Sequence, residues 1–153
     1  MVKKILITGA NGFLGSAITK LGIKKGYKVS ILVRKNSNLI NLKPFLSKLK
    51  VYYGNLEDIE SLNQPIKDND VIFHVAADYR LWSRKPAEIY AANVLGTENI
   101  ALKTLTHNKI LIYTSSVATL KLKKDFISDE NSEAKFDDMV GDYKKSKFLA
   151  EKI

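Results

Sequence analysis

The stretch ITGANGFLG, residues 7–15, decides the fold, because it joins an apolar run to a helix-like segment through three glycines spaced by three residues. In such a turn the first glycine allows a sharp bend, the second lets a pyrophosphate approach the backbone, and the third lets the helix pack closely on a sheet. Free N–H groups and the dipole at the helix start favour an anion. The stretch predicts a dinucleotide-binding turn, with a ligand-free glycine turn as the alternative. The candidate cofactor-binding residues here are Gly9, Asn11, Gly12, Phe13, Leu14 and Gly15.

Strand-like and helix-like segments alternate on both sides of this turn. We predict strands over residues 3–8, 27–34, 50–55, 70–77 and 109–116, and helices over 12–26 and 86–106. This alternation predicts an α/β fold, a Rossmann-type doubly wound parallel sheet with right-handed crossovers.

The remaining segments connect these elements. Residues 39–49 are expected to be irregular or helical, a short helix begins at Leu56 and is ended by Pro65, and the polar residues 121–138 form a loop. Asp137 or Asp138 is expected to cap the last helix.

The end of the second predicted strand reports on the cofactor. An acidic residue there would bind the ribose 2′-hydroxyl of NAD, but the chain has Arg34, followed by Lys35 and Ser37. A cation favours a 2′-phosphate, so we predict NADP in preference to NAD. The alternative is a surface arginine in a lysine-rich protein.

Tyr143 and Lys147 form the one Y-x-x-x-K match in the chain, on a helix-like stretch that ends the sequence. Positions four apart share a helix face, so both side chains can reach the same cofactor. A nearby ammonium lowers the pKa of a phenol and makes it a better acid–base catalyst. Ser116, in the YTSS segment that ends the last predicted strand, could hold a substrate oxygen against the phenol. The alternative is an amphipathic helix with a tyrosine on its core face.

Composition narrows the remaining function classes. The 153 residues suit one domain, and the absence of cysteine excludes disulfides and thiolate zinc sites; we predict no metal site. No apolar run is long enough for a membrane span or a signal peptide, so we expect a cytoplasmic protein. The net charge of +9 comes mostly from scattered lysines, which argues against a nucleic-acid partner.

Together these residues resemble the short-chain dehydrogenase/reductase superfamily, in its extended, epimerase–dehydratase-like branch. The resemblance covers the whole chain and is carried by the segments TGANGFLG, HVAADYRLW, AANVLGTENI, YTSSVATL and YKKSK. Within the branch, VAADYRLW and YTSSVATL look like the hopanoid-associated sugar epimerases, which are similar to dihydroflavonol 4-reductases.

The resemblance implies a role for each matching residue. Tyr143 would be the general acid–base, Lys147 would bind the ribose and lower the tyrosine pKa, and Ser116 would position the substrate oxygen. Asn93 would support either a proton relay or the packing beside the site. Further cofactor contacts would come from Asn55, where the family usually has Asp, and from Leu56, Ala76, Ala77 and Thr114. The substrate side would be lined by Tyr79, Arg80 and Trp82, for which a plain surface loop is the alternative.

The implied reaction is hydride transfer between a nicotinamide and a carbinol carbon of a sugar-like or nucleotide-sugar substrate. An epimerase would return the hydride to the other face, whereas a reductase would release the alcohol. The closer family match favours the epimerase and Arg34 favours the NADPH-dependent reductase. A non-catalytic dinucleotide-binding regulator is the rival class. A homodimer is also compatible with the sequence.

Extended members of the superfamily are about twice as long and carry most of the substrate pocket in their second half. We therefore expect residues 1–153 to be an NAD(P)-binding Rossmann domain without its substrate domain: a fragment, an engineered truncation or an incomplete gene product. We expect this chain alone to turn over substrate weakly.

Overall fold

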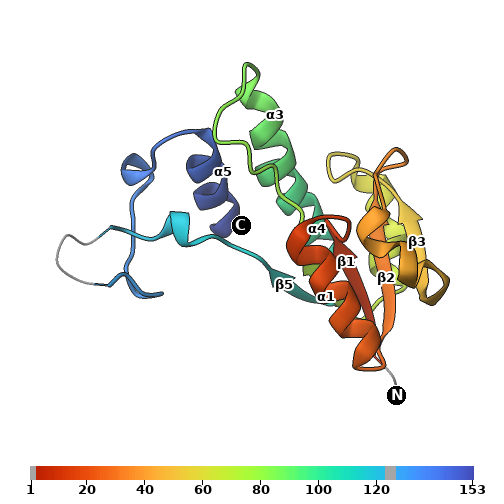
Figure 1. Ribbon diagram of the computed structural model, residues 1–153. Helices are drawn as coiled ribbons and strands as arrows, with labels where there is room; N and C mark the ends of the chain where they lie inside the picture. Colours follow the sequence, from red (N-terminus) through yellow and green to blue (C-terminus); the bar gives the residue numbers. More distant parts are fainter. Residues whose placement is uncertain (1–2, 123–126) are drawn as a thin grey trace. The chain divides into compact units, whose positions relative to one another are not determined.

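The computed structural model describes residues 3–122 and 127–153, and the chain forms two compact units (Figure 1). The first unit comprises residues 1–77 and 99–114. The second comprises residues 78–98 and 115–153.

The first unit is built on a parallel sheet of five strands in the order β3-β2-β1-β4-β5. The strands are β1 (Lys4–Thr8), β2 (Lys28–Val33), β3 (Leu49–Tyr53), β4 (Val71–His74) and β5 (Ile110–Tyr113). The order runs outward in both directions from β1, which is the doubly wound Rossmann arrangement that the sequence predicted. All five predicted strands are present, and each of their ends lies within three residues of the predicted one.

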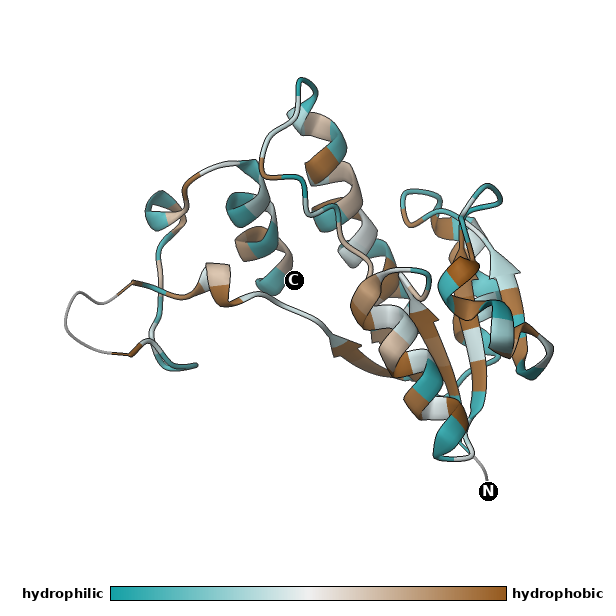
Figure 2. Ribbon diagram, viewed as in Figure 1, coloured by the Kyte–Doolittle hydropathy of each residue, from teal (hydrophilic) through white to brown (hydrophobic). Residues whose placement is uncertain are grey.

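Side chains that alternate along the strands form a hydrophobic core on each face of the sheet, and apolar colour follows the strands in Figure 2. On one face Ile5, Ile7 and Ile31 pack with Leu42 and with residues of α1 (Phe13–Lys24). On the other face Leu6, Leu32 and Ile72 pack with three buried side chains from the helical segments, namely Leu62, Ile66 and Ile100.

The helical connections correct one prediction. Residues Ile40–Lys48 form 3-10 turns, as the irregular pattern suggested. The helix predicted over residues 12–26 is α1, which ends at Lys24 and is followed by Gly26 at a positive φ of 79°. Pro65, however, does not end a helix: it lies within the short helix α2 (Asn63–Lys67), after a 3-10 turn at Ile59–Leu62. In the first helical turn a backbone N–H has no intrahelical partner, so proline is tolerated there.

The predicted helix over residues 86–106 is present, with Pro86 at its start, but one turn is wider than an α-helix. It consists of α3 (Pro86–Tyr90), a π-helical segment at Ala91–Leu95 and α4 (Gly96–Thr106). Helix α3, the π-helical segment and residues 96–98 belong to the second unit, whereas residues 99–106 belong to the first. Such π-helical turns are rare and are often found at functional sites.

The second unit also contains the last helix, α5 (Asp142–Glu151), and 3-10 turns at Val117–Thr119 and Phe136–Asp138. The predicted cap is wrong. Asp138 accepts a hydrogen bond from the Lys135 N–H and so closes the 3-10 turn, while Gly141, at a φ of 82°, stands at the N-cap of α5. Part of the predicted 121–138 loop, residues 123–126, lies outside the described residues; the rest is irregular apart from that turn.

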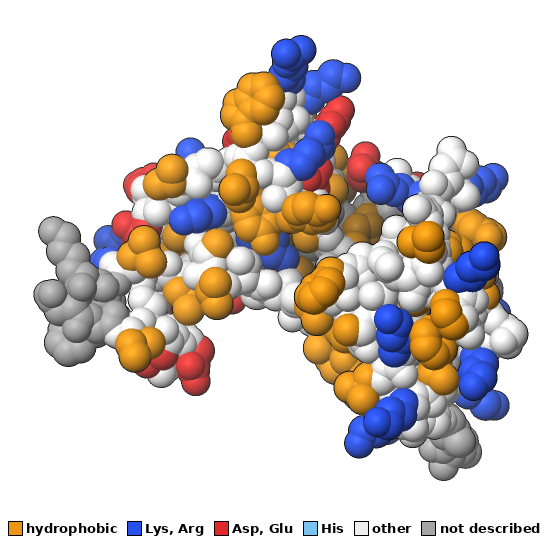
Figure 3. All heavy atoms as spheres, viewed as in Figure 1, with side chains coloured by type: hydrophobic (Ala, Val, Ile, Leu, Met, Phe, Trp, Pro, Cys, Tyr) orange, Lys and Arg blue, Asp and Glu red, His pale blue; other side chains and the backbone are white. Residues whose placement is uncertain are grey.

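No helix in residues 3–122 and 127–153 has the length and apolar character that crossing a membrane requires. On the face seen in Figure 3, Lys and Arg side chains are spread over both units with hydrophobic groups between them. They form no continuous basic stripe on that face.

Candidate functional site

Close backbone packing explains why two positions of the glycine turn, Gly9 and Gly15, require glycine. Gly9 has a φ of 67°, and a Cβ on it would lie 2.7 Å from the backbone of Ala76. A Cβ on Gly15 would lie 2.1 Å from the carbonyl oxygen of Gly9. Both distances are far inside van der Waals contact, so no other residue fits either position. Gly12 is exposed and less crowded, because a Cβ on it would lie 3.3 Å from the carbonyl oxygen of Gly9.

Helix α1 begins at this turn without a side-chain cap. Gly12 is the N-cap residue, no side chain accepts a hydrogen bond from the first turn, and that turn holds no acidic residue. The side chains of Phe13 and Leu14 are exposed. Amide groups left open at the start of a twelve-residue helix are a site for an anion such as a pyrophosphate.

The end of β4 is tied to the end of β1 by one hydroxyl. Thr8 Oγ1 accepts hydrogen bonds from the N–H groups of Val75 and Ala76, each 3.2 Å long, and lies 2.7 Å from Nδ1 of the buried His74. This holds Ala76 against Gly9. The predicted adenosine contacts Ala76 and Ala77 are both partly exposed beside the turn.

The other predicted cofactor residues of the first unit lie at the carboxyl ends of its strands. Arg34 follows β2, is exposed and forms no ion pair with any described residue. Asn55 follows β3, is exposed, and its main chain is held by Ser61. The Leu56 carbonyl accepts a hydrogen bond from Asn99, and Thr114 continues the pairing of β5 with β4. These positions share the sheet edge at which ligands of doubly wound sheets bind.

Helix α5 places Tyr143 and Lys147 one turn apart in the second unit. Lys147 is 3% exposed, and burial lowers the pKa of its ammonium to about 8, although the Glu151 carboxylate acts in the opposite direction. Tyr143 is half-buried. A buried lysine whose pKa lies near the working pH is a common feature of functional sites.

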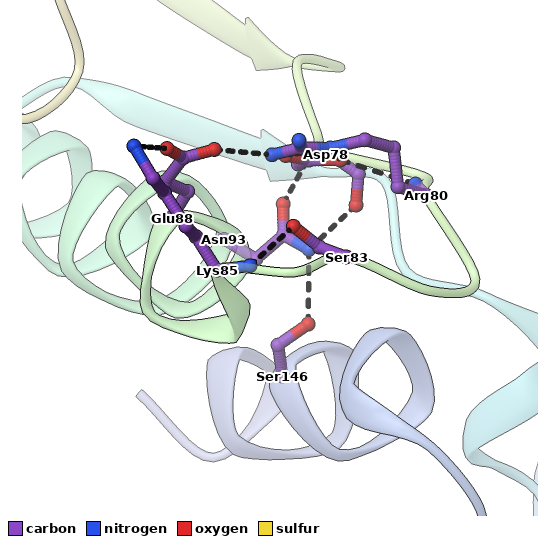
Figure 4. A network of polar contacts seen from close by, with 7 residues as sticks. All are labelled: Asp78, Arg80, Ser83, Lys85, Glu88, Asn93 and Ser146. Atoms are coloured by element: carbon purple, nitrogen blue, oxygen red, sulfur yellow. Dashed lines mark hydrogen bonds and ion pairs between the residues drawn. The ribbon is translucent and has the colours of Figure 1, made fainter.

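Asn93, in the π-helical turn, is the centre of a polar network in the second unit (Figure 4). Its Oδ1 accepts from the Asp78 N–H at 2.7 Å, and its Nδ2 donates to the Asp78 carbonyl at 2.8 Å and to Ser146 Oγ at 2.9 Å. Ser146, fully buried, donates in turn to the Tyr143 carbonyl. Of the two roles considered for Asn93, these contacts favour packing beside the site.

The Asp78 loop carries the residues predicted on the substrate side. Arg80 donates to both oxygens of Asp78, at 2.6 Å for the closest pair, and to Glu88 at 3.1 Å (Figure 4). These two carboxylates raise its pKa, Asp78 contributing most. The guanidinium is therefore already neutralised within the loop. Tyr79 and Trp82 are 80% and 73% exposed.

The two serines after β5 differ in their surroundings. Ser116 Oγ accepts a hydrogen bond from the Ala118 N–H and caps the 3-10 turn, so its O–H hydrogen has no acceptor among the described residues. Ser115 Oγ is buried without any partner in the described part of the chain. Ser116 thus keeps the donor that the substrate-positioning role needs.

The residues of this candidate site lie in a segment that matches a known protein family. Residues 5–153 match the model of the NAD dependent epimerase/dehydratase family. The chain belongs to this family.

Two curated members cover nearly the whole chain. One, named "Putative dihydroflavonol 4-reductase" in Synechocystis sp., is 35% identical over 99% of this chain and 44% of that protein. The other, 2-alkyl-3-oxoalkanoate reductase of Shewanella oneidensis, is 30% identical over 99% of the chain and 38% of that protein. The chain therefore spans less than half the length of these epimerase/dehydratase family members.

A solved structure of similar fold is that of gox2253, with a TM-score of 0.89 and 38% identity over 98% of this chain and 46% of the other. The Rossmann sheet of the first unit is thus the fold of the family.

Three residues in or beside the candidate site of this epimerase/dehydratase family member were not predicted from the sequence. Ser146 and Asp78 are the partners of Asn93, and Ser115 is a buried hydroxyl without a partner in the described residues. The only available signal for Ser146 was its place inside the YKKSK segment. Asp78 and Ser115 stand beside predicted site residues, but spacing alone says nothing of their contacts.

Proposed function

We propose that residues 1–153 are the dinucleotide-binding domain of an NAD(P)-dependent oxidoreductase that uses Tyr143 as acid–base catalyst. The observation that carries this proposal is Lys147, buried four residues after Tyr143 with its pKa lowered to about 8. Burying a lysine is costly, and a role in binding and proton transfer accounts for it. Family membership and the glycine turn support the same reading.

The residues present fit a dinucleotide. Backbone crowding leaves room only for glycine at residues 9 and 15, and the open amide groups of α1 would hold the pyrophosphate. Arg34 would bind a 2′-phosphate, which supports NADP over NAD. When bound, the nicotinamide would supply or accept the hydride.

The protein's own groups would move the proton. The Tyr143 hydroxyl would donate a proton to a carbonyl oxygen or withdraw one from the alcohol, and the Lys147 ammonium would stabilise the phenolate form. Ser116 O–H would donate to the same substrate oxygen. Asn93 and Ser146 would keep α5 and its two functional side chains in register with the π-helical turn.

The direction we favour is reduction of a ketone with NADPH, because two curated relatives are named as reductases and Arg34 suits NADPH. The second candidate is epimerisation of a sugar or nucleotide sugar, as in hopanoid-associated sugar epimerases. The family description and the VAADYRLW and YTSSVATL segments favour it. The engaged guanidinium of Arg80 counts against a diphosphate partner at that residue.

Calorimetric titration of the folded chain with NADP and NAD, followed by assays of wild type and Tyr143→Phe, tests the proposal. Binding of either dinucleotide, with turnover lost and binding kept in the variant, is the expected result. Net NADPH consumption with a ketone indicates the reductase, and interconversion of two sugar epimers without net consumption indicates the epimerase.

Two results would count against catalysis. A folded chain that binds neither dinucleotide removes the proposed cofactor role. If the chain binds a dinucleotide but the Tyr143→Phe variant behaves like the wild type in every assay, the non-catalytic regulator becomes the better interpretation. Gel filtration of the same sample tests the homodimer that the sequence allows.

A further inference from the structure

A pocket lies in the first unit, away from the glycine turn. Its volume is about 530 Å³, and it opens at the amino ends of β1, β2 and β3. The glycine turn follows the carboxyl end of β1, at the opposite edge of the sheet. The proposed dinucleotide site therefore does not account for this pocket.

The pocket is strongly basic. Lys4, Lys28 and Lys48 line it and form no ion pair with any residue that the structure describes. Lys4 and Lys28 are register partners on adjacent strands. Lys50 also lines the pocket, but its ammonium is 2.8 Å from the Asp68 carboxylate.

Only part of this charge is neutralised by neighbouring acids. Asp68 also accepts from the Tyr52 hydroxyl and from Gln64, and the hydrogen bond from Lys50 is the main reason that its pKa falls to about 2. Asp70 accepts the backbone N–H of Lys4 and does not line the pocket. The lining therefore holds four ammonium groups against one carboxylate.

One buried polar atom at the pocket has no partner among the described residues. The Oδ1 atom of Asn69, a residue that is 1% exposed, accepts no hydrogen bond, although its Nδ2 donates to the Pro65 carbonyl at 2.7 Å. Ser30 also lines the pocket, and its hydroxyl makes no hydrogen bond to a described residue. Buried polar groups without partners are rare, and one explanation is a ligand that supplies the partner.

We propose that this pocket binds a phosphate monoester of a small polyhydroxylated molecule, such as a sugar phosphate. The phosphate would lie among the lysines, which attract a dianion. A ligand hydroxyl would donate to Asn69 Oδ1, and the Ser30 hydroxyl would donate to a ligand oxygen. A pocket of about 530 Å³ is within the usual size range of small-molecule sites and exceeds what inorganic phosphate fills.

Calorimetry with glucose 6-phosphate tests this site, with glucose and inorganic phosphate as matched probes. We expect one binding event per chain, tighter for the ester than for either probe, and unchanged in the presence of saturating NADP. The proposal does not depend on the proposed oxidoreductase function. A chain that fails to bind NADP but binds the ester would still support the ester site.

Lys28→Gln should weaken ester binding about tenfold, the loss typical of one charge-assisted hydrogen bond. Lys43→Gln is the matched control, because Lys43 is exposed and outside the pocket, and the variant loses the same charge. Ser30→Ala should weaken binding without lowering the melting temperature, since it removes a hydroxyl that lines the pocket and makes no hydrogen bond to a described residue.

Four results would overturn the proposal. They are no binding of the ester, equal affinity for inorganic phosphate, equal weakening by Lys28→Gln and Lys43→Gln, and displacement of the ester by NADP. The third would indicate general attraction to a basic protein. The fourth would place the ester at the glycine turn.

Discussion

The glycine turn and helix α5 carry the two halves of the proposed chemistry, and they obtain their properties in different ways. The turn is specified by backbone sterics within eight residues of sequence and by one neighbouring segment, at Ala76. Helix α5 has an unremarkable sequence. Its Lys147 acquires an unusual pKa because burial excludes water from its ammonium group.

This difference teaches that a motif can fix geometry locally but cannot fix an electrostatic environment. A backbone clash acts over a few ångströms and depends on one or two atoms. Desolvation depends on every group that packs around the charge, and those groups come from distant segments. Mutations in the two regions should therefore fail in different ways.

The largest effect is expected for Gly15→Ala. A Cβ there would meet the Gly9 carbonyl oxygen at 2.1 Å, and neither backbone can move without shifting the start of α1. We expect a loss of about 3 kcal/mol or more in the free energy of unfolding, measured by urea denaturation.

Gly12→Ala is the matched control for that variant, because its Cβ would lie 3.3 Å from the same oxygen. Its stability should fall by less than about 1 kcal/mol, while dinucleotide binding weakens. Equal destabilisation by both variants would show that general helix propensity, and not the backbone contact, dominates at the turn.

The next effect in size is expected for Lys147→Met. The folded protein lowers the pKa of this lysine from 10.5 to about 8, so the charged form opposes folding. The variant should raise the free energy of unfolding at pH 7 by on the order of 2 to 3 kcal/mol. Stability of the wild type should rise between pH 8 and 10.5, since the folded chain has released a proton that the unfolded chain still holds.

The Lys147→Met variant should lose this rise of stability with pH. Urea denaturation at pH 7 and pH 9.5 measures both the gain in stability at pH 7 and the rise. Lys144→Met, on the same helix but not buried, should keep it. A Lys147→Met protein that is less stable at both pH values, with the rise intact, would contradict the assignment of the titration to Lys147.

Arg34→Leu should change binding and leave stability alone. Because Arg34 is exposed and forms no ion pair with a described residue, the folded chain does not depend on it. NADP affinity should fall by about 2 kcal/mol, the scale of a charge-assisted hydrogen bond, and NAD affinity should stay the same. An equal loss for both dinucleotides in calorimetry would remove Arg34 as the reader of the 2′-phosphate.

The sequence predicted the sheet and the turn well for a physical reason. Apolar runs such as the one that ends in Thr8 and the spacing of Gly9, Gly12 and Gly15 are local patterns, and parallel strands covered on both faces follow from them. The errors were also local. Pro65 sits in a first helical turn where its ring is harmless, and Asp138 closes its own 3-10 turn before α5 begins.

What the sequence could not give were contacts between distant residues. Asn93 and Ser146 are 53 positions apart, and no periodicity reports their hydrogen bond. The π-helical turn that holds Asn93 leaves no clear mark on the sequence AANVLG. The engagement of Arg80 by Asp78 and Glu88 is of the same kind, because it follows from the loop's conformation.

The smallest effect is expected for Ser146→Ala, and it tests how α5 is held. The variant removes one acceptor from Asn93 Nδ2, which keeps its bond to the Asp78 carbonyl, and removes the bond to Tyr143 O. Since the amide is not left without a partner, stability should fall by only about 1 kcal/mol.

Ser146→Thr restores the hydroxyl and should recover part of that loss, although the added methyl must fit a fully buried site. The informative readout is the pKa of Lys147, followed by NMR of the lysine side chain. If Ser146 orients α5 in its buried setting, the alanine variant loosens that setting, water reaches the ammonium, and the pKa moves up toward 10.5. An unchanged pKa with the same stability loss would mean that Ser146 contributes a hydrogen bond and nothing to the environment of Lys147.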